Sequence, residues 1–227
     1  MPLDDMDSDM MMAYETYLKN NGVSPNSSSF YMRNLRAVYN RAVEKGLTSQ
    51  RFPFKHVYTG VDKTVKRAVP LKVIKRIKEM DFSMNPTFDF ARDMFLMSFY
   101  TRGMSFVDMA YLRKKDLQNG VLSYRRRKTG QQLFIRWEKC MQEIVDKYDT
   151  SQSNSLLPII KPFGYIDERK QYIYAAHNIN RCLKIIGKKL GLSVSLTLYV
   201  ARHAWASIAK SKNVPLSVIS EGMGHDS

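Results

Sequence analysis

Residues 121–137 alternate apolar and polar side chains in the manner of β-strands, whereas most of the remaining chain follows the spacing of helices. Within them, Lys128-Thr-Gly130 is typical of the turn of a β-hairpin. The sequence therefore predicts a mainly α fold with a small antiparallel β-sheet. The helices expected after the hairpin span residues 138–148, 170–190, 199–210 and 216–222.

Two helices are predicted near the start of the chain. Residues 10–20 have helical spacing and end at Asn21-Gly22, a good C-cap. Ser24 and Pro25 then suit the N-cap and first position of a second helix, which Gly46 ends. The apolar face of that helix is predicted to hold Tyr31, Leu35, Val38, Tyr39 and Ala42.

The second helix also carries Arg33 and Arg36 on its other faces. They are either part of a solvated surface or contacts to phosphate, and the pattern leaves both interpretations open. Residues 47–69 then lose the helical period and become polar and basic, as at Lys66 and Arg67. We predict a helical domain at 1–60, a basic linker at 61–69 and a second domain at 70–227.

The charge of the chain favours a polyanionic partner. Lys and Arg number 36 against 21 Asp and Glu, which gives a formal net charge of +15. A surface this basic repels itself unless a polyanion lies on it. Nucleic acid is the leading candidate, an anionic membrane is the weaker one, and a basic but unrelated enzyme is the remaining alternative.

Other signals narrow the class of protein. No apolar run approaches membrane-spanning length, and the acidic start of the chain lacks the features of a secretory signal. The two cysteines, Cys140 and Cys182, are interpreted as reduced core residues and not as a disulfide framework or zinc site. The chain is therefore predicted to be cytoplasmic.

Four cationic or imidazole side chains, Arg102, Lys128, Arg202 and His225, suit the chemistry of a phosphodiester. Two guanidiniums can fork around the non-bridging oxygens, a lysine on a hairpin turn can protonate a leaving oxygen, and a histidine can bind the phosphoryl group. No carboxylate cluster suited to a divalent metal stands near them, so the pattern indicates metal-free and cofactor-free chemistry with a protein nucleophile. Each residue also has a plain alternative, such as an ion pair between Arg102 and Asp108.

These residues lie in motifs that resemble those of the tyrosine recombinases, or phage-type integrases, especially those of mobile elements in Bacteroides-type bacteria. The resemblance covers nearly the whole chain. Residues 24–42 are similar to the core-binding domain of that family. The remaining motifs are Phe99-Tyr-Thr-Arg102-Gly-Met-Ser-Phe-Val-Asp-Met109, Arg127-Lys128-Thr-Gly130, Tyr199-Val-Ala-Arg202-His203-Ala-Trp-Ala and Gly224-His225.

The resemblance implies a C-shaped clamp around duplex DNA, made of a helical, SAM-like core-binding domain and a catalytic domain. Members cleave one strand with a tyrosine, form a 3′-phosphotyrosine, and rejoin strands as tetramers without ATP or metal. Carried onto this chain, Arg102 and Arg202 hold the scissile phosphate, Lys128 is the general acid, and Tyr199 and His225 bind phosphate oxygens. The further residues expected to contact DNA are Arg33, Arg36, Lys66, Arg67, Arg126, Arg127 and His203.

Three departures limit what is carried over. Arg102 precedes a glycine, where the commoner pattern has the glycine first; Tyr199 stands where a histidine is usual; and the nucleophilic tyrosine expected after His225 does not occur. We therefore expect a recombinase fragment, incomplete at both ends, that is a monomer in solution and binds DNA without cleaving it. The alternative is a naturally truncated, non-catalytic DNA-binding regulator.

Overall fold

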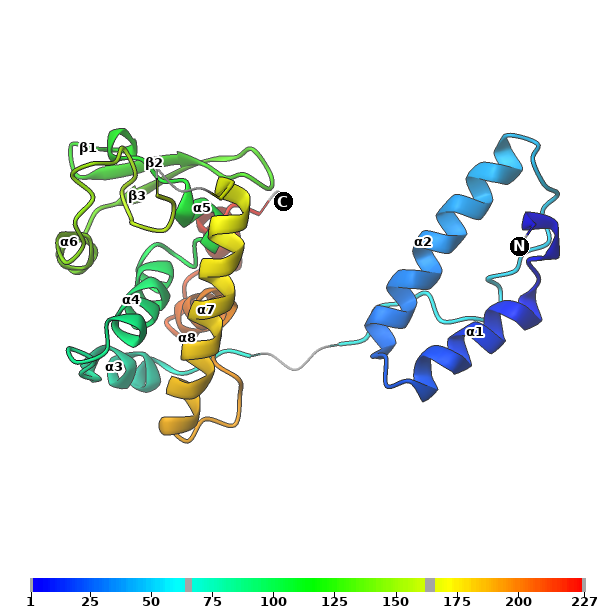
Figure 1. Ribbon diagram of the computed structural model, residues 1–227, viewed down its shortest axis with the longest axis horizontal. Coiled ribbons are helices and arrows are strands. Elements are labelled where there is room, and N and C mark those ends of the chain that lie inside the picture. The colour runs from blue at the N-terminus through cyan, green and yellow to red at the C-terminus, as the bar shows by residue number, and fades with distance from the viewer. Residues whose placement is uncertain (1, 64–66, 162–165, 226–227) are drawn as a thin grey trace. The chain divides into compact units, whose positions relative to one another are not determined.

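The computed structural model of the protein describes residues 2–63, 67–161 and 166–225 (Figure 1). The chain forms two compact units, Met1–Val65 and Lys66–Ser227. The expected linker at 61–69 contains residues 64–66, which lie outside the described ranges. Lys66, which we expected to contact DNA, is one of them. The boundaries at residues 60 and 70 therefore stay a prediction.

The first unit is built on two helices, α1 (Ser8–Asn20) and α2 (Pro25–Glu44), which follow a short 3-10 helix, η1 (Leu3–Asp5). The predicted start of α2 is confirmed: Ser24 accepts a hydrogen bond from the Ser27 N–H at 3.3 Å, and Pro25 is the first helical residue. The core of this unit is formed by Met6, Met11, Leu18, Met32, Tyr39, Phe54 and Val57.

The predicted apolar face of α2 is partly wrong. Tyr31 and Val38 are 43% and 64% exposed, whereas Ser28 and Ser29 are buried. The Ser29 hydroxyl can be buried because it donates to the carbonyl of Gly60 at 2.5 Å. The long segment after α2 thus covers the side of the helix that carries these serines. Hydrophobic periodicity predicts an exposed position for a polar residue, so it did not identify this side as buried.

The second unit is mainly helical, with three strands in the antiparallel order β1-β2-β3, so the predicted fold class is confirmed. Figure 1 shows the strands at one end of this unit and α3 at the other, with α4 between them. Its elements are α3 (Leu71–Glu79), α4 (Pro86–Tyr100), α5 (Phe106–Ala110), η2 (Lys114–Asp116), β1 (Leu117–Gln118), β2 (Val121–Arg125), β3 (Gln132–Arg136), α6 (Lys139–Asp146), α7 (Glu168–Lys189), α8 (Leu198–Ser211) and α9 (Leu216–Gly222).

Helix α4 is the centre of this unit, because it packs against α3, α6, α7 and α8. It begins at Pro86, after Asn85 caps it by accepting from the Phe88 N–H at 3.3 Å. Its side chains from Met94 to Met97 are all buried, which is typical of a helix that is apolar on every side. Among the described residues, none of the helices combines the length and apolar character needed to cross a bilayer.

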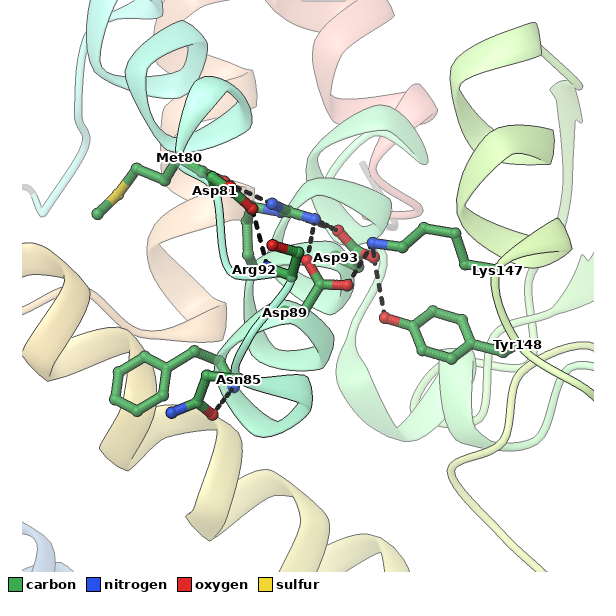
Figure 2. Close-up of polar contacts among 10 residues, drawn as sticks. Met80, Asp81, Asn85, Asp89, Arg92, Asp93, Lys147 and Tyr148 are labelled. Atoms are coloured by element: carbon green, nitrogen blue, oxygen red, sulfur yellow. Dashed lines mark hydrogen bonds and ion pairs between the residues drawn. The ribbon is translucent and has the colours of Figure 1, made fainter.

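A buried polar network fixes α4 to the end of α6 (Figure 2). Asp93 accepts hydrogen bonds from Lys147 Nζ at 2.5 Å and from the Tyr148 hydroxyl at 2.8 Å. Arg92 donates to Asp93 at 2.8 Å and to the Met80 carbonyl at 2.5 Å, and it also pairs with Asp89. Two carboxylates and two cations balance each other here, so the network acts as a cross-link.

We expect Asp93→Ala to destabilise the second unit by about 3 kcal/mol, because it leaves two partly buried cations short of a partner. Glu143→Ala is the matched control, since Glu143 and Lys139 are exposed and 3.9 Å apart, a pair worth less than about 1 kcal/mol. Denaturant unfolding followed by tryptophan fluorescence measures both, because Trp137 and Trp205 lie in this unit. Equal effects of the two substitutions would contradict the role given to the network.

Candidate functional site

Arg202 lies at the centre of the site, in a position set by the packing of α8. The buried side of α8 includes the small residues Ala201 and Ala204, which allow a close approach to α4. Arg202 lies on this same side and is only 8% exposed. The start of α8 is fixed from α7, because the Asn180 side-chain oxygen accepts from the Leu198 N–H at 2.9 Å. A guanidinium is thereby held inside the unit.

Backbone carbonyls hold the guanidinium of Arg202. Its Nη1 donates to the Gly103 carbonyl and its Nη2 to the Met223 carbonyl, both at 2.8 Å, and Nη2 also lies 2.9 Å from His225 Nε2. Among the described residues, no carboxylate forms an ion pair with it. Burial, and then the nearby Arg126, lower the pKa of Arg202, but an arginine stays charged. The positive charge is solvated by the dipoles of the backbone carbonyls. It is not neutralised by a carboxylate of the described residues, and this favours the binding of an anion.

The turn after α4, which contains Arg102 and Gly103, lies against Arg202. Arg102 and Gly103 both have positive φ, 60° and 74°, so the chain reverses sharply at the helix end. A Cβ on Gly103 would lie 2.6 Å from Arg202 Cα, closer than any side chain tolerates. Glycine at this position therefore permits both the turn and the contact with Arg202.

A cavity of about 630 Å³ opens beside Arg202. Its walls come from the turn after α4, the tip of the hairpin, α7, α8 and the segment after α9. Among the described lining residues there is no Asp or Glu. The polar side chains that line it include Ser105, Arg126, Lys128, Tyr199, Arg202 and His225.

Arg102 is not among the residues that line this cavity. Its side chain lies along α9, where a Cβ placed on Gly222 would be 3.6 Å from Arg102 Cδ and 3.5 Å from the Trp205 ring. The described residues show no ion pair between Arg102 and Asp108. The catalytic role predicted for Arg102 therefore stays a prediction.

Lys128 stands at the tip of the β2–β3 hairpin and is exposed. The turn is closed by two backbone hydrogen bonds of 2.8 Å, from Arg126 N to Gln131 O and from Gly130 N to Arg126 O. Gly130 has a φ of 74°, which suits glycine. The hairpin thus projects an ammonium group on a long, unrestrained side chain toward the cavity.

Arg126 is more deeply placed than the sequence indicated. It is 8% exposed, lines the cavity and donates to the Gly224 carbonyl, and the expectation that it contacts DNA stays a prediction. The signal for its burial was the alternation of β2, because Leu122 and Tyr124 point inward and Arg126 continues that face. Arg126 supplies a second guanidinium to the cavity that Arg202 also lines.

Arg127 points away from this cavity. Its backbone N–H donates to Asp108 Oδ1 at 2.9 Å, and its guanidinium lies 3.8 Å from the centroid of the Tyr111 ring. Asp108 is buried and also accepts from the Ser105 hydroxyl at 2.6 Å. Asp108 thereby ties the hairpin to the start of α5, which fixes the direction in which Lys128 is presented.

His225 lines the cavity, whereas His203 contacts Tyr199 outside its lining. His225 is exposed, and burial followed by the charges of Arg202, Arg126 and Lys128 lowers its pKa. His203 packs edge-on against Tyr199, with ring centroids 4.5 Å apart. Burial, and then Arg202 and Arg67, lower the pKa of His203.

Tyr199 is 63% exposed and presents its phenol to the cavity. The remaining residues expected to contact DNA, Arg33, Arg36 and Arg67, are all exposed. In the described ranges, no three His, Cys, Asp or Glu side chains come together in a way that could hold a metal ion. The site therefore presents guanidinium, ammonium, imidazole and phenol groups around one cavity, a set that can bind and polarise a phosphate.

Known proteins resemble this chain both in the sequence of its first domain and in its fold. Residues 1–57 match the family model of the phage integrase SAM-like domain. A lambda integrase dimer bound to a core site has a TM-score of 0.73 at 16% identity, over 100% of this chain and 81% of that one. The Tn1549 transposon integrase in complex with a circular intermediate DNA has a TM-score of 0.71 at 16% identity, over 99% of this chain and 79% of that one.

A lambda integrase tetramer bound to a Holliday junction also matches, with a TM-score of 0.68 at 15% identity, over 99% of this chain and 65% of that one. No curated protein sequence matches the chain. The predicted tyrosine-recombinase fold, with an integrase-type first domain, is thereby confirmed.

The fit between Gly103 and Arg202 predicts a graded effect of alanine substitution. Gly120→Ala meets nothing within 4 Å but has a φ of 72°, so it should cost about 1 kcal/mol from backbone strain. Gly103→Ala carries the same strain and also collides with Arg202, so it should cost about 2 kcal/mol more. Denaturant unfolding of the two variants makes the comparison, and equal losses would show that the close contact is not needed.

Proposed function

We propose that this chain, which has the integrase fold and an integrase SAM-like domain at its start, belongs to a site-specific DNA recombinase that binds duplex DNA. In the full-length protein the site breaks and rejoins strands through a 3′-phosphotyrosine. The observation that carries the proposal is the carboxylate-free cavity, where Arg126, Lys128, Arg202 and His225 come together around a space that a phosphodiester can enter.

The geometry suits the charge that develops during phosphoryl transfer. A phosphodiester gains negative charge on its oxygens as the phosphorus becomes five-coordinate, and a fixed guanidinium stabilises that charge without reorganising. Arg202 is fixed in this way by the carbonyls of Gly103 and Met223. Lys128, on a hairpin tip, can reach the leaving 5′-oxygen and donate a proton to it.

Arg126 and Arg102 are the two candidates for the second guanidinium on the phosphate. The position of Arg126 in the cavity wall supports it directly. Arg102 would first have to leave its place beside Gly222. We therefore propose Arg126 and Arg202 as the phosphate clamp in the conformation seen here, with Arg102 as a contributor only after rearrangement.

We also propose that residues 1–227 bind DNA without becoming covalently attached to it. Burial raises the pKa of Tyr124, and burial raises that of Tyr100 to about 12, so neither phenol is suited to attack. Tyr199 lines the cavity, but its place one helical turn before Arg202 suits a hydrogen bond to a phosphate oxygen. We assign Tyr199 that role in place of the usual histidine.

The surrounding surface should follow the DNA backbone. Arg67 approaches His203 closely enough to influence its pKa, which extends the positive region beyond the cavity. Tetramers on DNA are proposed for the full-length recombinase and a monomer for these residues alone, with the cytoplasm as the location. The other residues proposed to contact phosphates are Arg33, Arg36, Lys66 and Arg127.

Binding to duplex DNA should weaken steeply with salt, because each phosphate contact releases condensed counterions. Replacing one phosphate-contacting arginine lowers the slope of log K against log[salt] by about 1. We expect this for Arg126→Gln and Arg202→Gln, and little change for Arg136→Gln, whose side chain lies on β3 away from the cavity and pairs with Glu138 at 3.5 Å. Fluorescence anisotropy at several salt concentrations measures the slopes.

The same titration separates the two clamp candidates. If Arg102→Gln lowers the slope and Arg126→Gln does not, Arg102 is the second clamp and the assignment of Arg126 is wrong. Affinity that ignores salt would contradict phosphate-directed binding altogether.

A nicked suicide duplex, in which the cleaved end diffuses away, tests the absence of attack. We expect residues 1–227 to give no species of higher mass on a denaturing gel, because we assign Tyr199, the tyrosine among the described lining residues, to phosphate binding. A covalent complex that Tyr199→Phe abolishes would assign Tyr199 as the nucleophile and overturn its proposed binding role.

A further inference from the structure

Three consecutive residues, 223–225, form hydrogen bonds to the guanidiniums of Arg126 and Arg202, which both line the cavity. The Met223 carbonyl and His225 Nε2 are hydrogen-bonded to Arg202, and the Gly224 carbonyl accepts from Arg126. Gly224 is also fitted closely to the hairpin, since a Cβ there would be 3.0 Å from both Arg126 Cδ and Leu133 Cδ1. The segment after α9 is therefore bound by the same groups that would receive a phosphate.

The donors of Arg202 are limited in number. Of its five N–H groups, the two on Nη2 serve Met223 and His225, and one on Nη1 serves Gly103. A guanidinium grips a phosphate with two neighbouring N–H groups, either from Nη1 and Nη2 or from Nε and Nη2. Both grips need an N–H on Nη2, so one of its two present partners has to give way.

His225 is the partner that can leave. Met223 ends α9, and its backbone N–H is itself held by the carbonyl of Ile219 at 3.0 Å. The His225 side chain is exposed, and no other hydrogen bond holds its ring among the described residues. Release of the imidazole thus disturbs one contact, whereas release of the Met223 carbonyl would move the end of a helix.

We propose that a phosphate entering the cavity displaces His225 Nε2 from Arg202, and that the imidazole then takes up a proton from solvent and donates Nε2–H to the phosphate. Binding of the oxyanion is therefore coupled to proton uptake at His225. This inference rests on the proposed function, because it requires the cavity to receive a phosphate.

The charges around His225 give the sign of the effect. Arg202 on α8, together with Arg126 and Lys128 on the hairpin, disfavours a charged imidazole, and burial acts in the same direction. The phenol of Tyr199 lines the same cavity, and Glu221 on α9 is exposed near the start of the segment. In the empty site Nε2 faces a donor and is neutral. An anion offsets the three cations, so the imidazole binds a proton more readily in the complex.

Because the complex holds more protons than the free protein, affinity should rise as the pH falls. The probe is sulfate, whose charge does not change between about pH 5.5 and about pH 8. We expect sulfate to bind this cavity several-fold more tightly at the lower pH, because the complex carries the additional proton on His225. ¹⁵N-histidine NMR of residues 1–227 should show a higher His225 pKa with sulfate present and both ring nitrogens protonated.

His177→Gln is the matched control, because His177 is exposed on α7 in the same unit and is not among the residues that line the cavity. This variant should keep the pH dependence of sulfate binding, and His225→Gln should lose it while still binding sulfate at high pH. The ring resonances of His56, in the first unit, should not respond to sulfate at all.

The outcomes separate the two proposals. If sulfate perturbs the Arg202 side-chain resonances but leaves the His225 pKa unchanged, or only moves the proton between its ring nitrogens, proton coupling is wrong and the phosphate site stands. If sulfate perturbs neither Arg202 nor His225 while DNA binding persists, the cavity does not receive phosphate and both proposals fail.

Discussion

The structure of the second unit depends on a buried arginine whose partners are backbone carbonyls. A charge that is 8% exposed needs solvation from the protein, and for Arg202 this comes from the peptide dipoles of Gly103 and Met223. These two residues follow different helices, α4 and α9, so one side chain on α8 connects the ends of two other helices. Because no carboxylate of the described residues pairs with it, Arg202 remains available to an anion.

The rest of the unit fixes the groups around that charge. The Asp93 network anchors α4 at its middle, so the turn at Gly103 begins from a rigid helix. Asp108 ties the hairpin to α5, and Arg126 ties it to Gly224. The backbone segments that carry Lys128 and His225 are thus attached to the same framework as Arg202, while both side chains are exposed.

The sequence was informative where local chemistry determines structure. Ser24-Pro25 marked the start of α2, and strand-like alternation on both sides of Lys128-Thr-Gly130 marked the hairpin, because caps and turns act over a few residues. It was less informative where a distant segment determines burial. The hydroxyl of Ser29 is satisfied by Gly60, which no periodicity argument anticipates, and the face of α2 was misassigned in consequence.

The candidate site shows the same division. Lys128 was correctly placed at the hairpin turn, because a turn is a local signal. The direction of a side chain at a left-handed residue cannot be read from the sequence, so the position of the Arg102 side chain against Gly222 was not foreseen. The burial of Arg126 could have been predicted from the sequence, because Arg126 continues the alternation that turns Leu122 and Tyr124 inward on β2.

A crystal structure of residues 1–227 with a short DNA duplex is the most direct measurement of the central claim. The account predicts a backbone phosphorus inside the cavity, with its oxygens within hydrogen-bonding distance of Arg202 and of a second guanidinium. DNA bound elsewhere on the surface, with Arg202 still joined to His225, would contradict it.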